Sequence, residues 1–476
     1  MDRPLVQLVR PIVWCRATDR IRDVAQRISE YDQSCALVST DAGLGIVTDH
    51  DFRHRVAAGE VGVDAPVSEL ATVPALTIDQ HATQAAGLLR MVEHAIHHLV
   101  VLDETDEPVG VVRAVDLAQV EVRDPLVVRS AIEAATTVDE VAEAAQLLPG
   151  TIVALHDREV AATHIGALHA AVVDAIIRRV LQLRRDPVLA QVRYSWLVLG
   201  SLARREPLPL SDLDTALVWA DPPPDPPPAE SIREAAGRIL DDLRQCALVP
   251  CPHGTGANNP TFSRSRAAWT AAISDWQRDP SGETALLMSA MVTDSRPLTE
   301  PELGRTLTSP IDDPTGSSRL VRHLLNEALG FRPPTGFVRD FVVEHNGEHR
   351  GQLDLKKGGL APVAALGRWV SMVTGDARGT TPERLRRGAD QGLLTTDEAQ
   401  TLTGAFQYVY AMVLHEEAEA LRSGATGSTF VAPGDLDSLT RRHLRESFRA
   451  IRSVQARLDE HWLARLERMS PRASMA

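Results

Sequence analysis

Cysteine is scarce in this sequence, and it has no long apolar run. Only four cysteines occur among the 476 residues, Cys15, Cys35, Cys246 and Cys251, which is too few and too scattered for a disulfide framework. No run approaches the ~18 apolar residues that a membrane span needs. The charged residues within Met1–Trp14 argue against a signal peptide. We therefore expect a soluble, cytoplasmic protein without a membrane partner.

Basic residues are also fewer than acidic ones. The chain has 64 Asp and Glu against 50 Lys and Arg, a formal net charge of -14 at pH 7. Because proteins that hold nucleic acid along a surface need clustered Lys and Arg, we expect no nucleic-acid partner. A small triphosphate stays compatible with this balance, since a bound metal ion can make one site locally positive. The length predicts two to four domains.

An internal repeat occupies residues 1–122. The segment Gly45–Phe52 recurs as Gly110–Leu117, and each copy follows a short apolar run, Ala36–Val38 or Leu99–Leu102. The pattern predicts the order helix, strand, strand, helix twice. One unit of this size cannot bury both faces of its sheet, so the two copies should pack on each other.

Three further regions are predicted after the repeat. Residues 123–189 have a helical pattern and are expected to form a connector. Residues 190–312 contain apolar runs typical of strands and are expected to form an α/β domain, whereas residues 313–476 are expected to form a helical bundle. The predicted fold is therefore multidomain, α/β followed by all-α.

Local signals within these regions support the division. Apolar residues recur every three or four positions from Ile165 to Leu183, which predicts a connecting helix with one apolar face that packs on its neighbours. The spacing of Thr395 and Glu398 is that of a capping box, and a last amphipathic helix is expected from about Leu436 to Leu466. The proline run Asp221–Pro228 predicts a stiff surface loop.

The segment Leu199–Asp214, LGSLARREPLPLSDLD, has the residues expected of a catalytic site. A strand ends at Gly200 and Ser201, where glycine allows close approach of a ligand and the amides and hydroxyl can hold phosphate oxygens. A second strand is predicted to present Asp212 and Asp214 on one face, because the two are separated by one residue. Paired carboxylates opposite a phosphate-binding turn suit two Mg²⁺ ions, typically ~3.5–4 Å apart.

This combination resembles the Gly-Ser, Asp-x-Asp signature of polymerase-beta-like nucleotidyltransferases. Three later segments resemble, more narrowly, the nucleotidyltransferase family related to the protein-PII uridylyltransferase and the glutamine synthetase adenylyltransferase. They are Cys251–Trp276 with Cys-Pro, Asn-Pro and two Trp, Thr293–Pro297 with Asp-x-Arg, and Leu353–Leu360 with Asp-x-Lys and Gly-Gly-Leu. The resemblance extends from about Asp124 to the end of the chain.

The resemblance implies transfer of a nucleoside monophosphate from a nucleoside triphosphate to a protein or small-molecule acceptor, with release of pyrophosphate. Asp212 and Asp214 would be the catalytic pair and would bind Mg²⁺, and Asp294 is the candidate third metal ligand. Lys356 would steer phosphate toward the metal, unless it merely begins a solvated helix. The residues that would bind the nucleotide are Gly200, Ser201, Arg204, Glu206 and Lys356.

The sequence also departs from that family. Ala203–Glu206 stands where the family usually has Gly-Arg-Gly-Glu, and no third carboxylate is assured. The alternative hypothesis is therefore a catalytically silent, nucleotide-sensing regulatory protein. A third hypothesis is a scaffold in which the repeats dimerise and the bundle docks a partner.

The paired repeats resemble CBS domains, which commonly bind adenine nucleotides between two copies. By resemblance, Asp51 and Asp116 would contact ribose hydroxyls and Thr48 would lie near phosphate. Arg113 takes the Thr position in the second copy, where it would either strengthen phosphate binding or form a surface salt bridge. An adenine-nucleotide effector and a homodimer through the repeats are both expected, although repeats that only dimerise remain an alternative.

Overall fold

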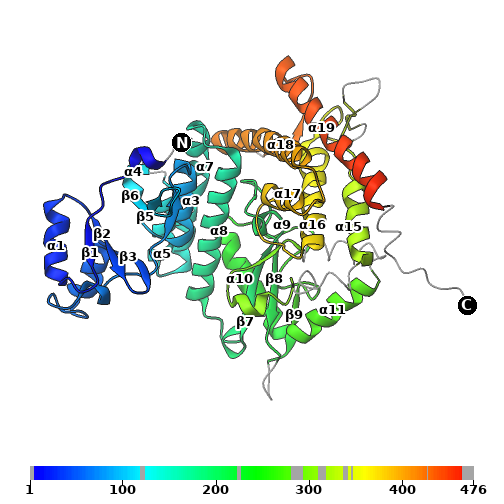
Figure 1. Ribbon diagram of the computed structural model, residues 1–476. Helices are drawn as coiled ribbons and strands as arrows, with labels where there is room; N and C mark the ends of the chain where they lie inside the picture. Colours follow the sequence, from blue (N-terminus) through cyan, green and yellow to red (C-terminus); the bar gives the residue numbers. More distant parts are fainter. Residues whose placement is uncertain are drawn as a thin grey trace, which may run out of the picture. The chain divides into compact units, whose positions relative to one another are not determined.

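The computed structural model describes residues 5–117, 124–221, 227–279, 293–308, 318–335, 341–344, 347–425 and 427–463. The chain forms two compact units, Met1–Ser130 with Arg158–Val160, and Ala131–Asp157 with Ala161–Ala476. Figure 1 shows the elements of both units. The predicted boundaries at 122/123 and 312/313, and residues 222–226 of the proline run, lie outside the described residues.

The first unit contains the predicted repeat. Its elements are η1 (Leu5–Leu8), β1 (Trp14–Arg16), α1 (Ile21–Glu30), β2 (Cys35–Thr40), β3 (Gly43–Thr48), α2 (Asp49–Asp51), η2 (Phe52–Val56), η3 (Val67–Glu69), β4 (Thr77–Asp79), α3 (Gln84–His94), β5 (His98–Leu102), β6 (Pro108–Arg113) and α4 (Ala114–Leu117). Each copy has a three-stranded sheet, in the order β1-β2-β3 or β4-β5-β6. In both sheets the first pair of strands is parallel and the second is antiparallel. The predicted order of elements is therefore confirmed for both copies.

The two copies share a core. Leu37 of β2 belongs to the same apolar cluster as Val100 of β5 and Val111 of β6. A polar contact also joins the copies, since Ser34 Oγ lies 2.7 Å from His98 Nε2. Burial lowers the pKa of His98 to about 4, so this imidazole is neutral at pH 7. The expectation that the copies pack on each other is confirmed.

The second unit contains a mixed sheet and many helices, and α5 (Pro125–Ala134) spans the division between the units. The remaining elements are α6 (Val138–Ala145), α7 (Leu148–Asp157), α8 (Ala162–Arg184), η4 (Leu189–Gln191), β7 (Tyr194–Leu199), α9 (Gly200–Ala203), β8 (Thr215–Trp219), α10 (Ala229–Gln245), β9 (Ser263–Ser265), α11 (Arg266–Arg278), β10 (Ser295–Pro297), α13 (Pro301–Gly304), α15 (Ser318–Gly330), β11 (Leu353–Asp354), η6 (Lys356–Leu360), α16 (Ala361–Thr374), α17 (Thr381–Asp390), α18 (Thr396–Ser423), β12 (Phe430–Val431), α19 (Ser438–Leu458) and η7 (Asp459–Leu463).

The sheet of this unit has the order β10-β7-β8-β9. Strands β10 and β8 are antiparallel to β7, and β9 is parallel to β8. The paired tryptophans belong to its core, because Trp269 of α11 is buried, donates its indole N–H to the carbonyl of Leu217 at 3.0 Å and packs edge-on against Trp276. Arg264 lies over both rings. These aromatic residues therefore stabilise the sheet that carries the site.

Helix α8 packs on its neighbours, as predicted, but it is buried on more than the one apolar face that the spacing indicated. Every residue from Ile165 to Ile177 is buried, including the polar side chains of His169 and Asp174. The physical reason is that α6, α7, α10 and α18 all pack against it. A helix that is apolar on most sides belongs to the interior, so the expected connector is a central helix of the second unit.

The C-terminal region is mostly helical, as predicted. Figure 1 shows α16, α17 and α18 side by side, and α17 packs against both of the others. The predicted capping box starts α18, with reciprocal hydrogen bonds between Thr395 and Glu398. The predicted last helix is α19, which continues as η7 to Leu463. One short ribbon, β11 with β12, was not predicted. Among the described residues, no helix combines the length and apolarity needed to cross a bilayer.

Candidate active site

The Gly-Ser turn lies directly after β7. Gly200 has a φ of +61°, a left-handed conformation that favours glycine. Its N–H donates to the carbonyl of Asp294 at 2.8 Å, and the N–H of Leu199 donates to the carbonyl of Asp214 at 3.0 Å. A Cβ atom at Gly200 would lie 3.4 Å from Asp214 Oδ2. The turn and one carboxylate of the predicted pair are therefore neighbours.

Asp212 and Asp214 lie in an extended segment just before β8, rather than within a strand as predicted. Leu213 between them is buried and pairs with Pro250 in an isolated bridge. Asp212 is exposed and Asp214 is partly buried. The segment alternates as a strand would, so the carboxylates emerge on the side opposite to Leu213.

The two carboxylates influence each other electrostatically. Burial raises the pKa of Asp214, and the charge of Asp212 raises it further. A hydrogen bond from Cys251 and the charges of Lys356 and His253 act in the opposite direction, but the pKa stays above its usual value. The negative charge of the two carboxylates is only partly balanced by nearby positive groups. Such oxygen ligands suit a hard divalent cation such as Mg²⁺.

The loop after α10 contributes neighbours that sequence reasoning did not assign to the site. Cys251 and His253 are both close enough to Asp214 to lower its pKa. Cys251 also lines a cavity of about 330 Å³, together with Thr255 and Asn258. The Cys-Pro and glycine-rich composition of this loop was the available signal, but composition alone does not show that the loop returns to the aspartates.

Lys356 begins η6, and its side chain is exposed. Its charge lowers the pKa of Asp214 and also that of the buried Glu417, whose pKa is raised overall by burial. This ammonium group therefore lies within electrostatic range of Asp214.

The structure corrects the assignment of Arg204 and Glu206 to nucleotide binding. Their exposed fractions are 8% and 4%, and Arg204 Nε lies 3.0 Å from Glu206 Oε2. Glu206 also accepts hydrogen bonds from the backbone N–H of Thr381 and, at 2.8 Å, from its hydroxyl. Buried charges need such partners, so these two side chains hold the site loop against α17 instead of facing a ligand.

The structure also contradicts the expectation that Asp294 is the third metal ligand. Asp294 is 1% exposed, and its carboxylate contacts Arg204, Arg368 at 2.7 Å and Arg384 at 2.5 Å. Burial alone would raise the pKa of this carboxyl, but the three guanidinium charges hold it well below its usual range. With both oxygens bound to arginine, this carboxylate is not available to a metal ion. Its backbone carbonyl instead holds Gly200.

The rest of the Asp-x-Arg motif supports the same turn. Arg296 of β10 binds the carboxylate of Asp174 on α8 at 2.6 and 2.9 Å. It also donates to the carbonyls of Leu202 at 3.0 Å and Ala203 at 3.2 Å. Arg296 therefore satisfies the carbonyls at the end of α9 and fixes the turn against α8.

Helix α18 holds the loop between the turn and the aspartates. The Tyr410 hydroxyl donates to the carbonyl of Pro207 at 2.8 Å, and the N–H of Leu210 donates to Glu417 Oε2 at 2.8 Å. The Tyr410 hydroxyl lies so close to α8 that a Cβ at Gly166 would be 2.1 Å from it. Contacts from α17 and α18 therefore position the loop that leads to Asp212 and Asp214.

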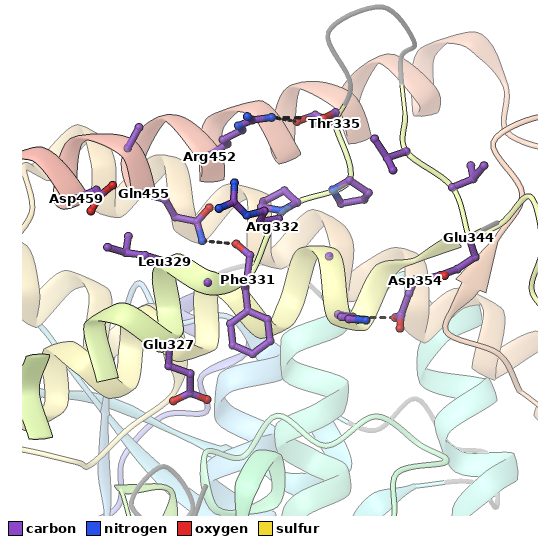
Figure 2. A pocket seen from close by; sticks show the side chains of 18 of the residues that line it. Glu327, Leu329, Phe331, Arg332, Thr335, Glu344, Asp354, Arg452, Gln455 and Asp459 are labelled. Atoms are coloured by element: carbon purple, nitrogen blue, oxygen red, sulfur yellow. Dashed lines mark hydrogen bonds between the residues drawn. The ribbon is translucent and has the colours of Figure 1, made fainter. Parts of the chain in front are cut away.

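A second cavity, of about 920 Å³, lies within the helical region and is shown in Figure 2. Charged groups of both signs line it: Arg332, Lys357, Arg452, Glu327, Glu344, Asp354 and Asp459. Gln455 donates to the carbonyl of Phe331 at 2.9 Å across part of its wall. Lys357 follows Lys356 directly, so one short segment adjoins both this cavity and the aspartate pair.

The expected ligand residues of the repeats have partners within the chain. Asp51 accepts hydrogen bonds at 2.8 Å from the Thr48 N–H and from the Thr48 hydroxyl. Asp116 binds Arg113 at 2.8 and 2.9 Å and Arg10 at 3.0 Å. Burial opposes ionisation of Asp116, but these arginines lower its pKa to about 2. Arg113 was expected either to bind phosphate or to form a salt bridge, and in this structure it forms the salt bridge with Asp116.

Family comparisons divide the chain in a way that agrees with these regions. The family "CBS domain" matches residues 6–58 and 67–123, and "Putative nucleotidyltransferase DUF294" matches 146–283. "Putative nucleotidyltransferase substrate binding domain" matches 318–462. By these matches the chain combines two CBS domains with the two domains of a DUF294-type nucleotidyltransferase.

Individual relatives match only part of the chain. "Uncharacterized protein MJ1404" of Methanocaldococcus jannaschii is 29% identical over 97 residues, 20% of this chain. The match spans 23% of that protein's length. An uncharacterized conserved protein from Pyrococcus horikoshii is 22% identical and has a TM-score of 0.23, with 25% of this chain and 97% of that chain covered. CBS domain protein PAE2072 from Pyrobaculum aerophilum, complexed with AMP, is 24% identical and has a TM-score of 0.23, with 25% and 93% covered.

Proposed function

We propose that this protein is a Mg²⁺-dependent nucleotidyltransferase that moves a nucleoside monophosphate from a nucleoside triphosphate to a hydroxyl of a protein or small molecule, as the protein-PII uridylyltransferase does. The observation that supports it is the position of Asp214 beside the Gly200 turn, with Asp212 close enough to raise the pKa of Asp214. In the proposed step the acceptor oxygen attacks the α-phosphorus. The bond from this phosphorus to its bridging oxygen breaks, pyrophosphate leaves, and the hydroxyl proton passes to a carboxylate of the site.

The residues of the site have distinct proposed roles. The backbone at Gly200 and the hydroxyl of Ser201 would hold triphosphate oxygens, and Lys356 would attract the phosphates by its charge. Asp212 and Asp214 would hold Mg²⁺, which when bound neutralises phosphate charge and acts as a Lewis acid. The raised pKa of Asp214 fits this role, because a cation relieves the repulsion between the carboxylates.

The acceptor would bind in the cavity of Figure 2, which lies within the region that the substrate-binding family matches. Its wall combines three cationic and four anionic side chains, as given above. A wall of mixed sign suits a zwitterionic small molecule or a peptide better than a polyanion. Lys357 lines this cavity, and Lys356, the residue before it, acts electrostatically on Asp214.

The repeats would regulate transfer by binding an adenine nucleotide. Asp51 and Asp116 would accept hydrogen bonds from ribose hydroxyls, and Thr48 and Arg113 would bind phosphate. Arg113 would have to leave Asp116 to do so. A homodimer through the repeats and a cytoplasmic location belong to the same proposal, the latter supported by four cysteines that are all free.

The test is incubation of the full chain with Mg²⁺, cell lysate and each of the four triphosphates labelled at the α-phosphate. We expect one triphosphate to label an acceptor and release pyrophosphate. The double variant Asp212→Asn, Asp214→Asn should lose this labelling, whereas Asp275→Asn, at an exposed ion pair on α11, should keep it. Equal labelling by the double variant would falsify the assignment of the site.

A second candidate function is a silent nucleotide sensor. The observation that favours it is the engagement of Asp294 by three arginines, which removes the expected third carboxylate. This candidate predicts calorimetric binding of AMP or ATP to the full chain, without pyrophosphate release from any triphosphate.

A further inference from the structure

Two histidines and a glutamate meet where α7 packs against α18, a place that the transfer reaction does not use. His156 lies near the C-terminal end of α7, and His415 and Glu419 lie on α18. One potential ligand atom from each residue lies within 4.8 Å of the others. His415 Nδ1 is 3.1 Å from His156 Nε2. All three residues belong to the second unit.

The local sequence explains half of this arrangement. His415 and Glu419 are four residues apart on a helix, so their side chains share one face. His156 comes from 259 positions earlier and reaches them only because α7 packs on α18. No spacing rule could therefore show the complete cluster.

The donor set is that of a transition-metal site. Two imidazole nitrogens and a carboxylate are ligands that Zn²⁺ binds in proteins, usually with tetrahedral geometry. Metal–nitrogen bonds of about 2.0–2.1 Å separate two tetrahedral ligands by roughly 3.3 Å, and the observed separation of 3.1 Å is close to this value. The carboxylate of Glu419 needs only a side-chain rotation to approach.

The surroundings of His156 also favour a cation. Its Nδ1 is buried without a hydrogen-bond partner and lies 3.6 Å from Asp157 Oδ1. A carboxylate near the far nitrogen of a metal-binding histidine orients the ring and increases its basicity. The C-terminal end of α7 adds the negative end of a helix dipole.

The side chain of Arg422 already lies near the cluster, but it does not balance all of the negative charge there. Arg422 contacts both Asp157 and Glu419, and it is 42% exposed. Two carboxylates and one guanidinium give a net charge of -1 when the histidines are neutral. Because Arg422 is partly in solvent, it can remain bound to Asp157 while Glu419 turns toward a metal ion.

We propose that His156, His415 and Glu419 form a binding site for a zinc-class divalent cation that ties α7 to α18. The site shares no residue with the aspartate pair. Soft and borderline ions should bind here in preference to Mg²⁺, because imidazole suits zinc, cobalt and nickel whereas magnesium prefers oxygen ligands. The cation would strengthen the packing of α18, the helix that holds the loop before Asp212.

The test uses the full chain, stripped of metal by a chelator and kept in excess Mg²⁺ so that oxygen sites are filled. Titration with Zn²⁺ by calorimetry, and with Co²⁺ by visible absorption, should reveal one site with the strong absorption of tetrahedral cobalt. The double variant His156→Gln, His415→Gln should weaken binding by more than the roughly 10–100-fold loss that follows from removing an outer-sphere partner. His461→Gln, which changes an exposed histidine on η7, should bind as the wild type does.

Glu419→Gln provides a second variant that keeps both rings and should also weaken Zn²⁺ binding, by roughly tenfold or more. Circular dichroism of each variant in the absence of metal distinguishes lost ligands from lost folding. Unchanged Zn²⁺ affinity in the double variant, or octahedral cobalt in the wild type, would overturn the proposal. Nucleotide transfer is a separate readout, so its absence leaves this test intact.

Discussion

Two aspartates contact the Gly200 turn, Asp294 through its backbone carbonyl and Asp214 through its carboxylate, and the fold compensates their charges differently. Asp294 is buried among Arg204, Arg368 and Arg384, and their positive charges hold its pKa well below the usual range of a carboxyl group. Burial raises the pKa of Asp214, and the neighbouring charge of Asp212 raises it further. A carboxylate that the fold neutralises stabilises the structure, whereas one left without full compensation is available to a cation. Charge balance therefore separates the structural aspartate from the candidate catalytic ones.

Asp294→Asn should have the largest effect on stability, because it leaves the buried guanidinium groups of Arg204 and Arg384, and the partly exposed one of Arg368, without their shared anion. We expect a loss of about 3–5 kcal/mol in the free energy of unfolding, measured by urea denaturation. Asp275→Asn, at an exposed ion pair, should cost less than about 1 kcal/mol. A loss for Asp294→Asn no larger than that of the control would show that the buried cluster is not structural.

The pH dependence of Asp294 follows from the lowered pKa of its carboxyl. A depressed pKa in the folded state contributes stability above the unfolded value of about 3.9, and this contribution is lost as the pH falls through the folded pKa. The wild type should therefore lose more stability than Asp294→Asn on acidification below about pH 4. Parallel acid-denaturation curves would contradict the lowered pKa.

Asp214→Asn should show the opposite pattern. Transfer activity should fall on the order of 10²–10³-fold, the usual cost of removing one preorganised electrostatic group. Stability in the presence of a chelator should stay the same or increase, because an uncompensated charge is removed. A raised folded pKa means that the wild type loses stability as the pH rises through the interval between the unfolded and folded values. A large loss of stability in the variant at pH 7 would make Asp214 structural too.

Gly200→Ala should combine a moderate structural effect with a loss of function. The left-handed backbone costs an alanine about 1–2 kcal/mol, and the new methyl group would face Asp214 Oδ2 at 3.4 Å. Gly392 is a matched control, since its φ is +69° and a Cβ there would meet nothing within 4 Å. Both variants should melt at similarly reduced temperatures, but only Gly200→Ala should lose pyrophosphate release. Equal activity in the two would show that the turn does not approach the nucleotide.

The sequence predicted the repeat, the Gly-Ser turn and the aspartate pair, because each is a local pattern. It did not distinguish the charges that bind ligand from those that are buried. Asp294 contacts Arg204 and Arg384 only in the folded unit, because each arginine is 90 positions away from it in the sequence. Likewise, Glu206 is bound by Thr381 of α17, 175 positions away. Such pairing depends on how helices pack on the sheet, for which one sequence offers no periodic signal.

The same comparison applies, with a smaller effect, to the two CBS copies. Asp51 accepts hydrogen bonds from Thr48, whereas Asp116 is paired with Arg113. Arg113→Thr gives the second copy the residue of the first and removes a salt bridge, and the stability cost should be below about 1 kcal/mol. If Arg113 binds phosphate, AMP affinity of the full chain should fall roughly tenfold in calorimetry, the equivalent of one charge-assisted hydrogen bond. If Arg113 serves only to hold Asp116 away from ribose, the variant should bind AMP more tightly instead.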